Sequence, residues 1–289
     1  VKVAALSRGG FDLKRAAVAR CRAGTPAGGG YIGEMSAPPD TTIANRYALE
    51  RELGRGGMAE VFRVTARGAG SFQKQFAVKR ITAGALDNED AVRRFKEEAH
   101  FNSKMSHPNV VQVLNFFRAN ETVYMVMQYE RGRTLQEHIQ KHKGEIRESF
   151  IRTVFARLLN GLREVHTHKL LHLDIKPSNV YLRNDGQPVL IDFGAARQTL
   201  SIDTPLLKPM YTPGFAAPEQ YNNTRRELLG PWTDIYSIGA SMYACMAGAA
   251  PRAADQRLDR DLLVPAPKRW PDKYSRQLLE TVDGCMRLN

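Results

Sequence analysis

The sequence has only three cysteines, Cys21, Cys245 and Cys285, and they lie far apart in a chain of 289 residues. Disulfide-dependent domains carry many closely spaced cysteines, and structural zinc sites pair cysteine or histidine at short intervals. Neither pattern is present, so the sequence excludes a disulfide framework and a zinc-finger module. We expect the chain to work in a reducing compartment, the cytoplasm.

Long apolar runs are also lacking. Residues 238–250 form the longest stretch of the C-terminal half that is free of charge and strong polarity. This stretch has about 13 residues, whereas a helix that crosses a bilayer needs about 20. Its glycine, alanine and serine content therefore predicts a buried helix, and no membrane span is expected.

The positive charge shows little clustering. The chain carries 42 Lys and Arg against 30 Asp and Glu, a net charge of +12. Residues 1–34 hold six of the cations and two of the acids, a surplus of +4, which leaves +8 for the rest. Because nucleic-acid-binding domains concentrate cations on one face, no nucleic-acid partner is expected. Residues 1–40 show little periodicity and predict a flexible basic extension.

Hydrophobic residues make up 43% of the chain, enough for a sizeable core. Short runs of β-branched and aromatic residues predict strands, and apolar residues at spacings of three and four predict helices. We expect strands at residues 47–53, 60–65, 76–81, 110–117 and 122–128, and helices at 90–105, 134–141 and 149–168. A small β-rich half thus precedes a larger α-rich half, and the change falls near residues 128–132.

A glycine-rich turn lies between the first two predicted strands. Gly54, Gly56 and Gly57 leave room for a hairpin to approach an anion, with backbone N–H groups directed at phosphate oxygens. The same turn occurs in hairpins that bind nothing. In the third predicted strand, Lys79 sends its ammonium either to solvent or to an anion in a cleft, and Glu98 on the next predicted helix is a suitable partner.

The helical half gathers carboxylates, a cation and an amide in two segments. Asp174, Lys176 and Asn179 share one loop, and Asp192 directly follows an apolar run. The oxygen atoms of Asn179 and Asp192 suit Mg²⁺, which prefers hard oxygen donors and bridges phosphates. A further motif begins at Thr212, before the sequence Ala-Pro-Glu.

In this order and spacing, the motifs resemble those of protein kinases, and they are most similar to the bacterial relatives of eukaryotic serine/threonine kinases. The resemblance covers residues 47–289. It implies an α+β, bilobal protein-kinase fold, with a small β-rich N-lobe (41–128) that carries helix C and a larger α-helical C-lobe (129–289). It also implies Mg²⁺ and ATP, transfer of the γ-phosphate to serine or threonine of protein substrates, and autophosphorylation.

The resemblance assigns a role to each matching position. It makes Asp174 the catalytic base and Asp234 the buried anchor of the base's loop. The other catalytic positions are Lys176, Lys79, Glu98 and Thr212. The nucleotide would contact Leu53, Gly54, Gly56, Gly57, Val61, Ala77, Lys79, Met127, Gln128, Tyr129 and Leu182, and the metal would be held by Asn179 and Asp192.

The substrate class follows from two of these positions. Lys176, two residues after the base, and Thr212 are typical of serine/threonine kinases rather than tyrosine kinases. The alternative is a pseudokinase, a nucleotide-binding scaffold without transfer, but such proteins usually lack the lysine, the base or the metal-binding aspartate. The resemblance also allows a homodimer through the N-lobe.

Three departures from the family pattern stand out. Leu173 replaces the arginine that usually pairs with a phosphorylated activation loop, so we expect less dependence on phosphate at Thr199, Ser201 or Thr204. Asn102 is polar where the family has an apolar residue, which predicts a weakened active position of helix C. The chain also stops inside the expected second-last helix, before the arginine that would pair with Glu219.

Overall fold

The structure is a computed structural model that describes residues 42–68, 71–198, 211–221 and 228–288. All of them belong to one unit, which spans Ser36–Asn289. Two predictions lie outside the described residues: the flexible basic extension at 1–40, and the candidate phosphorylation sites Thr199, Ser201 and Thr204.

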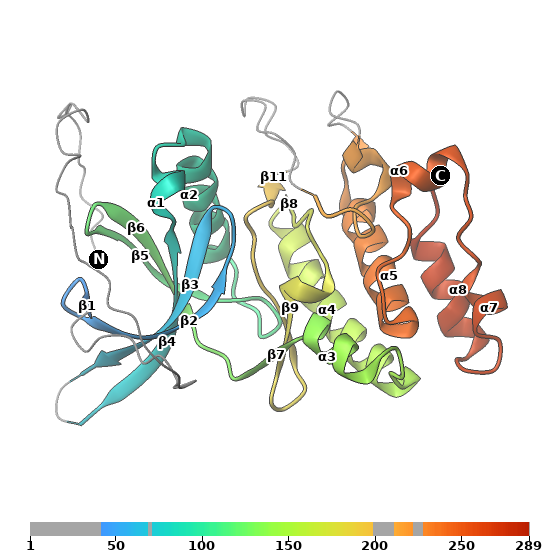
Figure 1. Ribbon diagram of the computed structural model, residues 1–289, viewed down its shortest axis with the longest axis horizontal. Coiled ribbons are helices and arrows are strands. Elements are labelled where there is room, and N and C mark those ends of the chain that lie inside the picture. Colours follow the sequence, from blue (N-terminus) through green and yellow to red (C-terminus); the bar gives the residue numbers. More distant parts are fainter. Residues whose placement is uncertain (1–41, 69–70, 199–210, 222–227, 289) are drawn as a thin grey trace, which may run out of the picture. The chain divides into compact units, whose positions relative to one another are not determined.

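A six-stranded antiparallel sheet forms the first half of this unit (Figure 1). Its strand order is β1-β2-β3-β4-β6-β5. The strands are β1 (Thr42–Ile43), β2 (Tyr47–Arg55), β3 (Ala59–Arg67), β4 (Gln73–Ile81), β5 (Val113–Ala119) and β6 (Thr122–Gln128). Five of the six were predicted. The sixth, β1, is a two-residue strand that is too short to produce a pattern.

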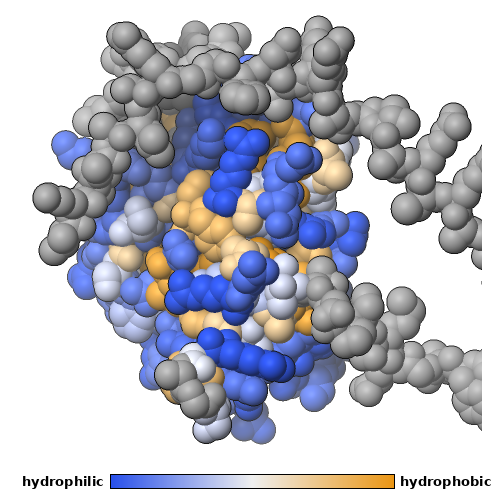
Figure 2. All heavy atoms as spheres, turned by 90° about the vertical axis from the view of Figure 1, so that its left-hand side faces the viewer, coloured by the Kyte–Doolittle hydropathy of each residue, from blue (hydrophilic) through white to orange (hydrophobic). Residues whose placement is uncertain are grey.

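Alternation along the strands separates the two faces of the sheet. Val78 and Val126 face one way and pack with Tyr47 and Phe62. Figure 2 views the molecule from the left-hand side of Figure 1 and shows hydrophobic residues gathered in the middle with hydrophilic residues around them. The other face carries a second cluster, which includes Ile81 and packs against the helix described next.

Helix α2 (Glu89–Ser103) covers this other face, after the short α1 (Ala83–Leu86). The Asn88 side chain caps it by accepting hydrogen bonds from the backbone N–H groups of Asp90 and Ala91. Phe95 and Ala99, four residues apart, are buried against the sheet. Glu98 on the same turn is thereby turned toward β4, as expected for helix C.

The strand predicted at 110–117 begins three residues later than expected. Val111 N donates to Leu190 O at 2.9 Å, and Leu190 N donates to Asn109 O at 2.8 Å. Asn109 Nδ2 also donates to Pro188 O at 2.7 Å. The segment before β5 therefore bonds to the second half of the unit, a long-range pairing that a run of apolar residues cannot reveal.

The second half is mainly helical. The helices are α3 (Leu135–His142), α4 (Glu148–Thr167), α5 (Pro231–Ala247), α6 (Ala254–Asp259), α7 (Ala266–Arg269) and α8 (Arg276–Cys285). Short strands lie among them: β7 (Gly132–Thr134), β8 (Leu170–Leu171), β9 (Val180–Arg183), β10 (Pro188–Leu190) and β11 (Arg197–Gln198). Two 3₁₀ turns span Pro177–Asn179 and Pro218–Tyr221.

Helix α5 is the buried centre of this half. Its side chains are buried almost all round from Thr233 to Met246, which confirms the buried helix predicted at 238–250 as far as Ala247, whereas residues 248–250 lie outside the helix. It ends at Ala247 because Gly248 adopts φ +76°, a left-handed conformation that favours glycine. A Cβ at Gly239 would lie 2.5 Å from Cβ of Cys285, so this glycine lets α8 pack closely. Of the helices in the described ranges, none combines the length and hydrophobicity that a membrane crossing requires.

Candidate active site

Lys79 lies at the centre of a three-residue ion cluster. Its Nζ donates to both carboxylate oxygens of Glu98 at 2.7 Å and to Oδ1 of Asp192 at 2.8 Å. Burial would lower the pKa of Lys79, but the two carboxylates outweigh it and raise that pKa above its ordinary value. The ammonium therefore stays charged and joins β4, α2 and the segment after β10.

Asp192 is an ionised carboxylate in a strained backbone position. Its φ is +63°, which is uncommon for a residue with a side chain. The Lys79 ammonium lowers the pKa of Asp192 to about 2. Nearly half of its side chain, 47%, is exposed. One face of the carboxylate is thus free to meet a cation while the other is held by Lys79.

A second cluster joins Asp174, Lys176 and Thr212. Thr212 Oγ1 donates to Asp174 Oδ1 at 2.7 Å. Lys176 Nζ donates to Thr212 Oγ1 at 2.8 Å and lies 2.8 Å from Asp174 Oδ2. The three side chains close a triangle that fixes the orientation of the carboxylate and places a positive charge beside it.

Asn179 connects the two clusters. Its Nδ2 donates to Asp174 O at 2.9 Å and to Asp174 Oδ2 at 3.1 Å. Its backbone O accepts from Ile191 N at 2.9 Å, one residue before Asp192. Because the amide nitrogen is engaged, the amide oxygen is the atom that remains for a cation. The oxygens of Asn179 and Asp192 therefore form a donor set that fits Mg²⁺.

Asp234, on α5, binds the backbone of the loop that carries Asp174. Its Oδ2 accepts from His172 N at 3.0 Å and its Oδ1 from Leu173 N at 2.8 Å. These bonds stabilise a loop in which Leu173 has φ +62°. Asp234 is fully buried, so the anchoring role expected from the resemblance agrees with its contacts.

Two residues in this region were not anticipated. His166 Nε2 lies 2.8 Å from Asp234 Oδ2. Gln220 Nε2 donates to Leu173 O at 2.8 Å, and Gln220 Oε1 accepts from Ala217 N at 2.9 Å. His166 lies within a predicted helix and Gln220 directly follows a motif, but no spacing rule marks either one, because both act through partners far away in the sequence.

The His172 ring packs between the loop and the Asp192 segment. Its centroid lies 4.6 Å from that of Phe193. Burial lowers the pKa of His172, so the ring is neutral. Because Nδ1 accepts from Asp174 N at 3.3 Å, the proton is on Nε2, which donates to Ile191 O at 3.3 Å.

Asn102, the polar departure on α2, is buried at 1% exposure. Its Nδ2 donates to Glu98 O at 3.1 Å, whereas its Oδ1 has no hydrogen-bond partner among the described residues. The expected weakening of helix C is not visible in the geometry, because the pair between Lys79 and Glu98 is closed.

Val61, Ala77 and Met127 share one face of the sheet with Lys79, whereas Gln128 lies opposite Phe76 and faces the other way. Val61 lies opposite Lys79 in the register, and Ala77 lies opposite Met127. A Cβ at Gly54 or Gly57 would meet no atom within 4 Å, so the protein's own packing does not require these glycines. Leu53 is 38% exposed and Leu182 is 5% exposed. Gln128 ends β6, and Tyr129 follows it.

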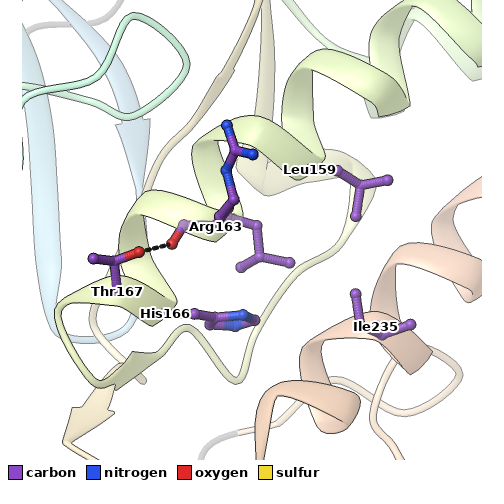
Figure 3. A pocket seen from close by; sticks show the side chains of 6 residues that line it. Leu159, Arg163, His166, Thr167 and Ile235 are labelled. Atoms are coloured by element: carbon purple, nitrogen blue, oxygen red, sulfur yellow. Dashed lines mark hydrogen bonds between the residues drawn. The ribbon is translucent and has the colours of Figure 1, made fainter.

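A separate surface hollow of about 370 Å³ lies between α4 and α5. It is lined by Leu159, Leu162, Arg163, His166, Thr167 and Ile235. Figure 3 shows His166 and Ile235 pointing toward one another across it. None of the predicted nucleotide or metal residues lines this hollow.

Comparison with known proteins adds to this geometry. The family described as "Protein kinase domain" matches residues 47–289. A probable serine/threonine-protein kinase of Clostridium perfringens is 32% identical over 74% of this chain and 30% of its own length. Serine/threonine-protein kinase pkn3 of Myxococcus xanthus is 31% identical over 80% of this chain and 42% of its own length.

Two further similarities bear on the site. Tyrosine-protein kinase MasK of Myxococcus xanthus is 29% identical over 73% of this chain and 34% of its own length. A solved structure titled "PpkA-294 apo form" superposes with a TM-score of 0.74 at 30% identity, covering 88% of this chain and 94% of that chain. The chain therefore spans 30% to 42% of the length of these three curated relatives.

Proposed function

The chain belongs to the protein kinase domain family, and we propose that it transfers the γ-phosphate of ATP, with Mg²⁺, to serine and threonine hydroxyls of proteins. The observation that carries this proposal is the triangle of Asp174, Lys176 and Thr212. A carboxylate held by a hydroxyl and an ammonium is a suitable acceptor for the proton of a substrate hydroxyl.

The proposed transfer exchanges one phosphorus–oxygen bond for another. The substrate oxygen forms a bond to the γ-phosphorus while the bond from that phosphorus to the β-phosphate oxygen breaks. The hydroxyl proton passes to Asp174, and ADP leaves. Lys176 neutralises charge on the transferred group, and Lys79 holds the remaining phosphates. Phosphoryl transfer needs alignment and charge neutralisation more than covalent help, which these fixed side chains provide.

The metal would be held by the amide oxygen of Asn179 and the carboxylate of Asp192. When bound, Mg²⁺ would supply positive charge that offsets the negative charge of the phosphates. Asp192 can serve because its low pKa keeps it ionised and its carboxylate is half exposed. Asn179 can serve because its nitrogen is already engaged with Asp174.

The contact between Lys176 and Thr212 supports serine and threonine over tyrosine as acceptors. A short aliphatic hydroxyl must come close to Asp174, and the Thr212 side chain occupies the space beside that carboxylate. Because one relative is named a tyrosine kinase, the acceptor residue has to be measured. A scaffold without transfer is not favoured, since Lys79, Asp174 and Asp192 all retain their partners.

We extend the proposal to autophosphorylation and to work in the cytoplasm. A single experiment tests transfer and acceptor type together. The purified protein is incubated with Mg²⁺, radiolabelled ATP and a mixed protein substrate, and the labelled amino acids are separated after hydrolysis. We expect phosphoserine and phosphothreonine, and none with Lys79→Met. Phosphotyrosine as the main product would refute the acceptor assignment, and no label with the wild type would refute the activity.

A further inference from the structure

Glu60 is a buried carboxylate at the base of the glycine-rich loop. It is 6% exposed, and the sheet register places it directly between Arg55 on β2 and Arg80 on β4. Its Oε1 lies 2.6 Å from Arg55 Nη1, and its Oε2 accepts from Arg80 Nη2 at 2.6 Å. One carboxylate therefore ties three neighbouring strands together. We call Arg55, Glu60 and Arg80 the ion row.

The ion row lies next to the residues expected to meet a nucleotide, but on the opposite face of the sheet. The adjacent register positions are Gly54, Val61 and Lys79. Because successive side chains of a strand point to opposite faces, the ion row points away from the face that carries Lys79. The row can act on a nucleotide only through the backbone, by fixing where the loop lies.

The other restraints on the loop are uncharged. The hairpin closes with one hydrogen bond from Gly56 N to Ala59 O at 2.8 Å, and Thr82 N donates to Met58 O at 3.0 Å. Glycines add no side chains that could pack, and they leave the backbone free to move. Thr82 Oγ1 also donates to Met58 O at 3.5 Å, and Met58 and Ala59 pack with the cluster of Ile81. Among the described residues, the two ion pairs of Glu60 are the ionic contacts that hold the base of the loop to the strand of Lys79.

Arg55 has a second carboxylate partner, which offers a matched control. Its Nε and Nη2 donate to the two oxygens of Glu52 at 3.1 and 2.8 Å. The Glu52 side chain is 39% exposed, against 7% for Glu60, and it connects Arg55 only to its own strand. Exposed ion pairs contribute little, whereas the loss of one partner from a buried pair is costly.

We propose that Glu60 is a positioning residue that keeps the glycine-rich loop in the place where it can cover a bound nucleotide. This inference rests on the proposed function, because it assumes that ATP binds beneath the loop. A site whose competent conformation is populated only in part binds more weakly by that fraction. If the loop of a Glu60 variant is seated about one tenth of the time, the apparent Kd for nucleotide rises about tenfold.

The test compares Glu60→Gln, Arg55→Met and the control Glu52→Gln with the wild type. Calorimetry measures the Kd for a non-hydrolysable ATP analogue with Mg²⁺. Hydrogen exchange measures protection of residues 53–59 without nucleotide, and melting reports whether each variant is folded. We expect Glu60→Gln and Arg55→Met to raise the Kd about tenfold and to speed exchange in 53–59. KM for ATP should rise in parallel, with kcat at saturating ATP within about threefold.

Several outcomes would overturn the inference. One is a Kd within twofold of the wild type for folded Glu60→Gln. Another is an increase in Kd for Glu52→Gln as large as that for Glu60→Gln. Nucleotide binding would then depend on negative charge near the loop in general and not on the position of Glu60. If Glu60→Gln does not fold, Arg55→Met, which changes an exposed side chain, tests the inference by the same Kd and exchange measurements. A wild type that binds no nucleotide would refute the proposed function, and the exchange of 53–59 would still decide whether Glu60 holds the loop.

Discussion

Thr212 Oγ1 donates a 2.7 Å hydrogen bond to Asp174 Oδ1, although 38 positions separate the two residues. This bond holds the segment that carries Thr212 against the candidate catalytic base. Lys176 donates to the same hydroxyl, so the threonine accepts from a cation and donates to an anion. Both ends of this bridge are charge-assisted, and such hydrogen bonds are about twice as strong as neutral ones.

The first prediction concerns this hydroxyl. Thr212→Val keeps the shape of the side chain but removes the bridge between Asp174 and Lys176. A lost hydrogen bond to a charged group corresponds to about 1.5–3 kcal/mol, so we expect transfer to a serine peptide to slow by about 10- to 100-fold. Thr212→Ser, which retains the hydroxyl, should keep most of the rate. Equal kcat for Thr212→Val and the wild type would show that the bridge is not used.

The second prediction concerns the loop beyond the described residues. Leu173 is 5% exposed and packs with Leu171, Ala195 and Leu229, where the family has a cation for a phosphate. Its backbone is held by Asp234 and Gln220, without a contribution from its side chain. We therefore expect the triple replacement of Thr199, Ser201 and Thr204 by alanine to keep kcat within about threefold on an added substrate.

The matched measurement for that triple variant uses protein treated with a phosphatase. If untreated wild type is fast and both the treated wild type and the triple variant are inactive, the loop needs phosphate and the hypothesis is wrong. Equal rates for all three proteins would support the hypothesis that apolar packing around Leu173, and not a phosphate, stabilises the loop of Asp174.

The third prediction concerns Asn102. Its buried Oδ1 lacks a partner among the described residues, and an unsatisfied buried polar atom costs about 1–3 kcal/mol. Asn102→Leu removes that atom and adds apolar contact next to the pair of Lys79 and Glu98. We expect a higher melting temperature and a basal rate equal to or above that of the wild type. A slower enzyme with unchanged stability would count against a role of Asn102 in weakening helix C.

The fourth prediction is a pH dependence of stability. Ser275 donates from both its Oγ and its N to Glu148 at 2.6 Å, which lowers the pKa of Glu148 to about 2. In the unfolded chain this carboxyl has its ordinary pKa, so below about pH 4.5 the unfolded state takes up the proton first. The stabilisation by Glu148 is thus complete at pH 7 and is lost as the pH falls toward 2.

Glu148→Gln tests this directly. At pH 7 it should lower the free energy of unfolding by about 1–3 kcal/mol, and the difference from the wild type should shrink between pH 5 and 3. Glu145→Gln is the control, because Glu145 is 78% exposed and pairs with Lys273. A difference for Glu148→Gln that stays constant over this pH range would mean that the carboxylate charge does not stabilise the fold.

Much of the architecture could be predicted from the sequence, because local patterns report local structure. The helix expected at 149–168 is α4, shifted by one residue, since its apolar spacing reflects the face it buries. Glu98 as the partner of Lys79 is confirmed by their ion pair. The predicted start of β5 was wrong, because Val111 donates to Leu190 and Leu190 donates to Asn109, a pairing that no local pattern contains.

The supporting contacts of the site escaped prediction for the same reason. His166, Gln220 and Glu60 are ordinary polar residues in the sequence. They become important only because the fold brings Asp234, Leu173 and Arg80 next to them. Motif spacing identifies groups that share a loop, such as Asp174 and Asn179, but it carries no information on which distant side chain supports that loop.

If Asp174 accepts the substrate proton, Asp174→Asn should remove phosphoryl transfer and leave nucleotide binding in place. One stopped-time assay with labelled ATP and a serine peptide, at saturating concentrations of both, measures kcat for the wild type and the variant. We expect Asp174→Asn to lose at least about 100-fold in kcat, while its Kd for the nucleotide, measured by calorimetry, stays within about threefold of the wild type. An asparagine variant that phosphorylates the peptide at the wild-type rate would contradict it.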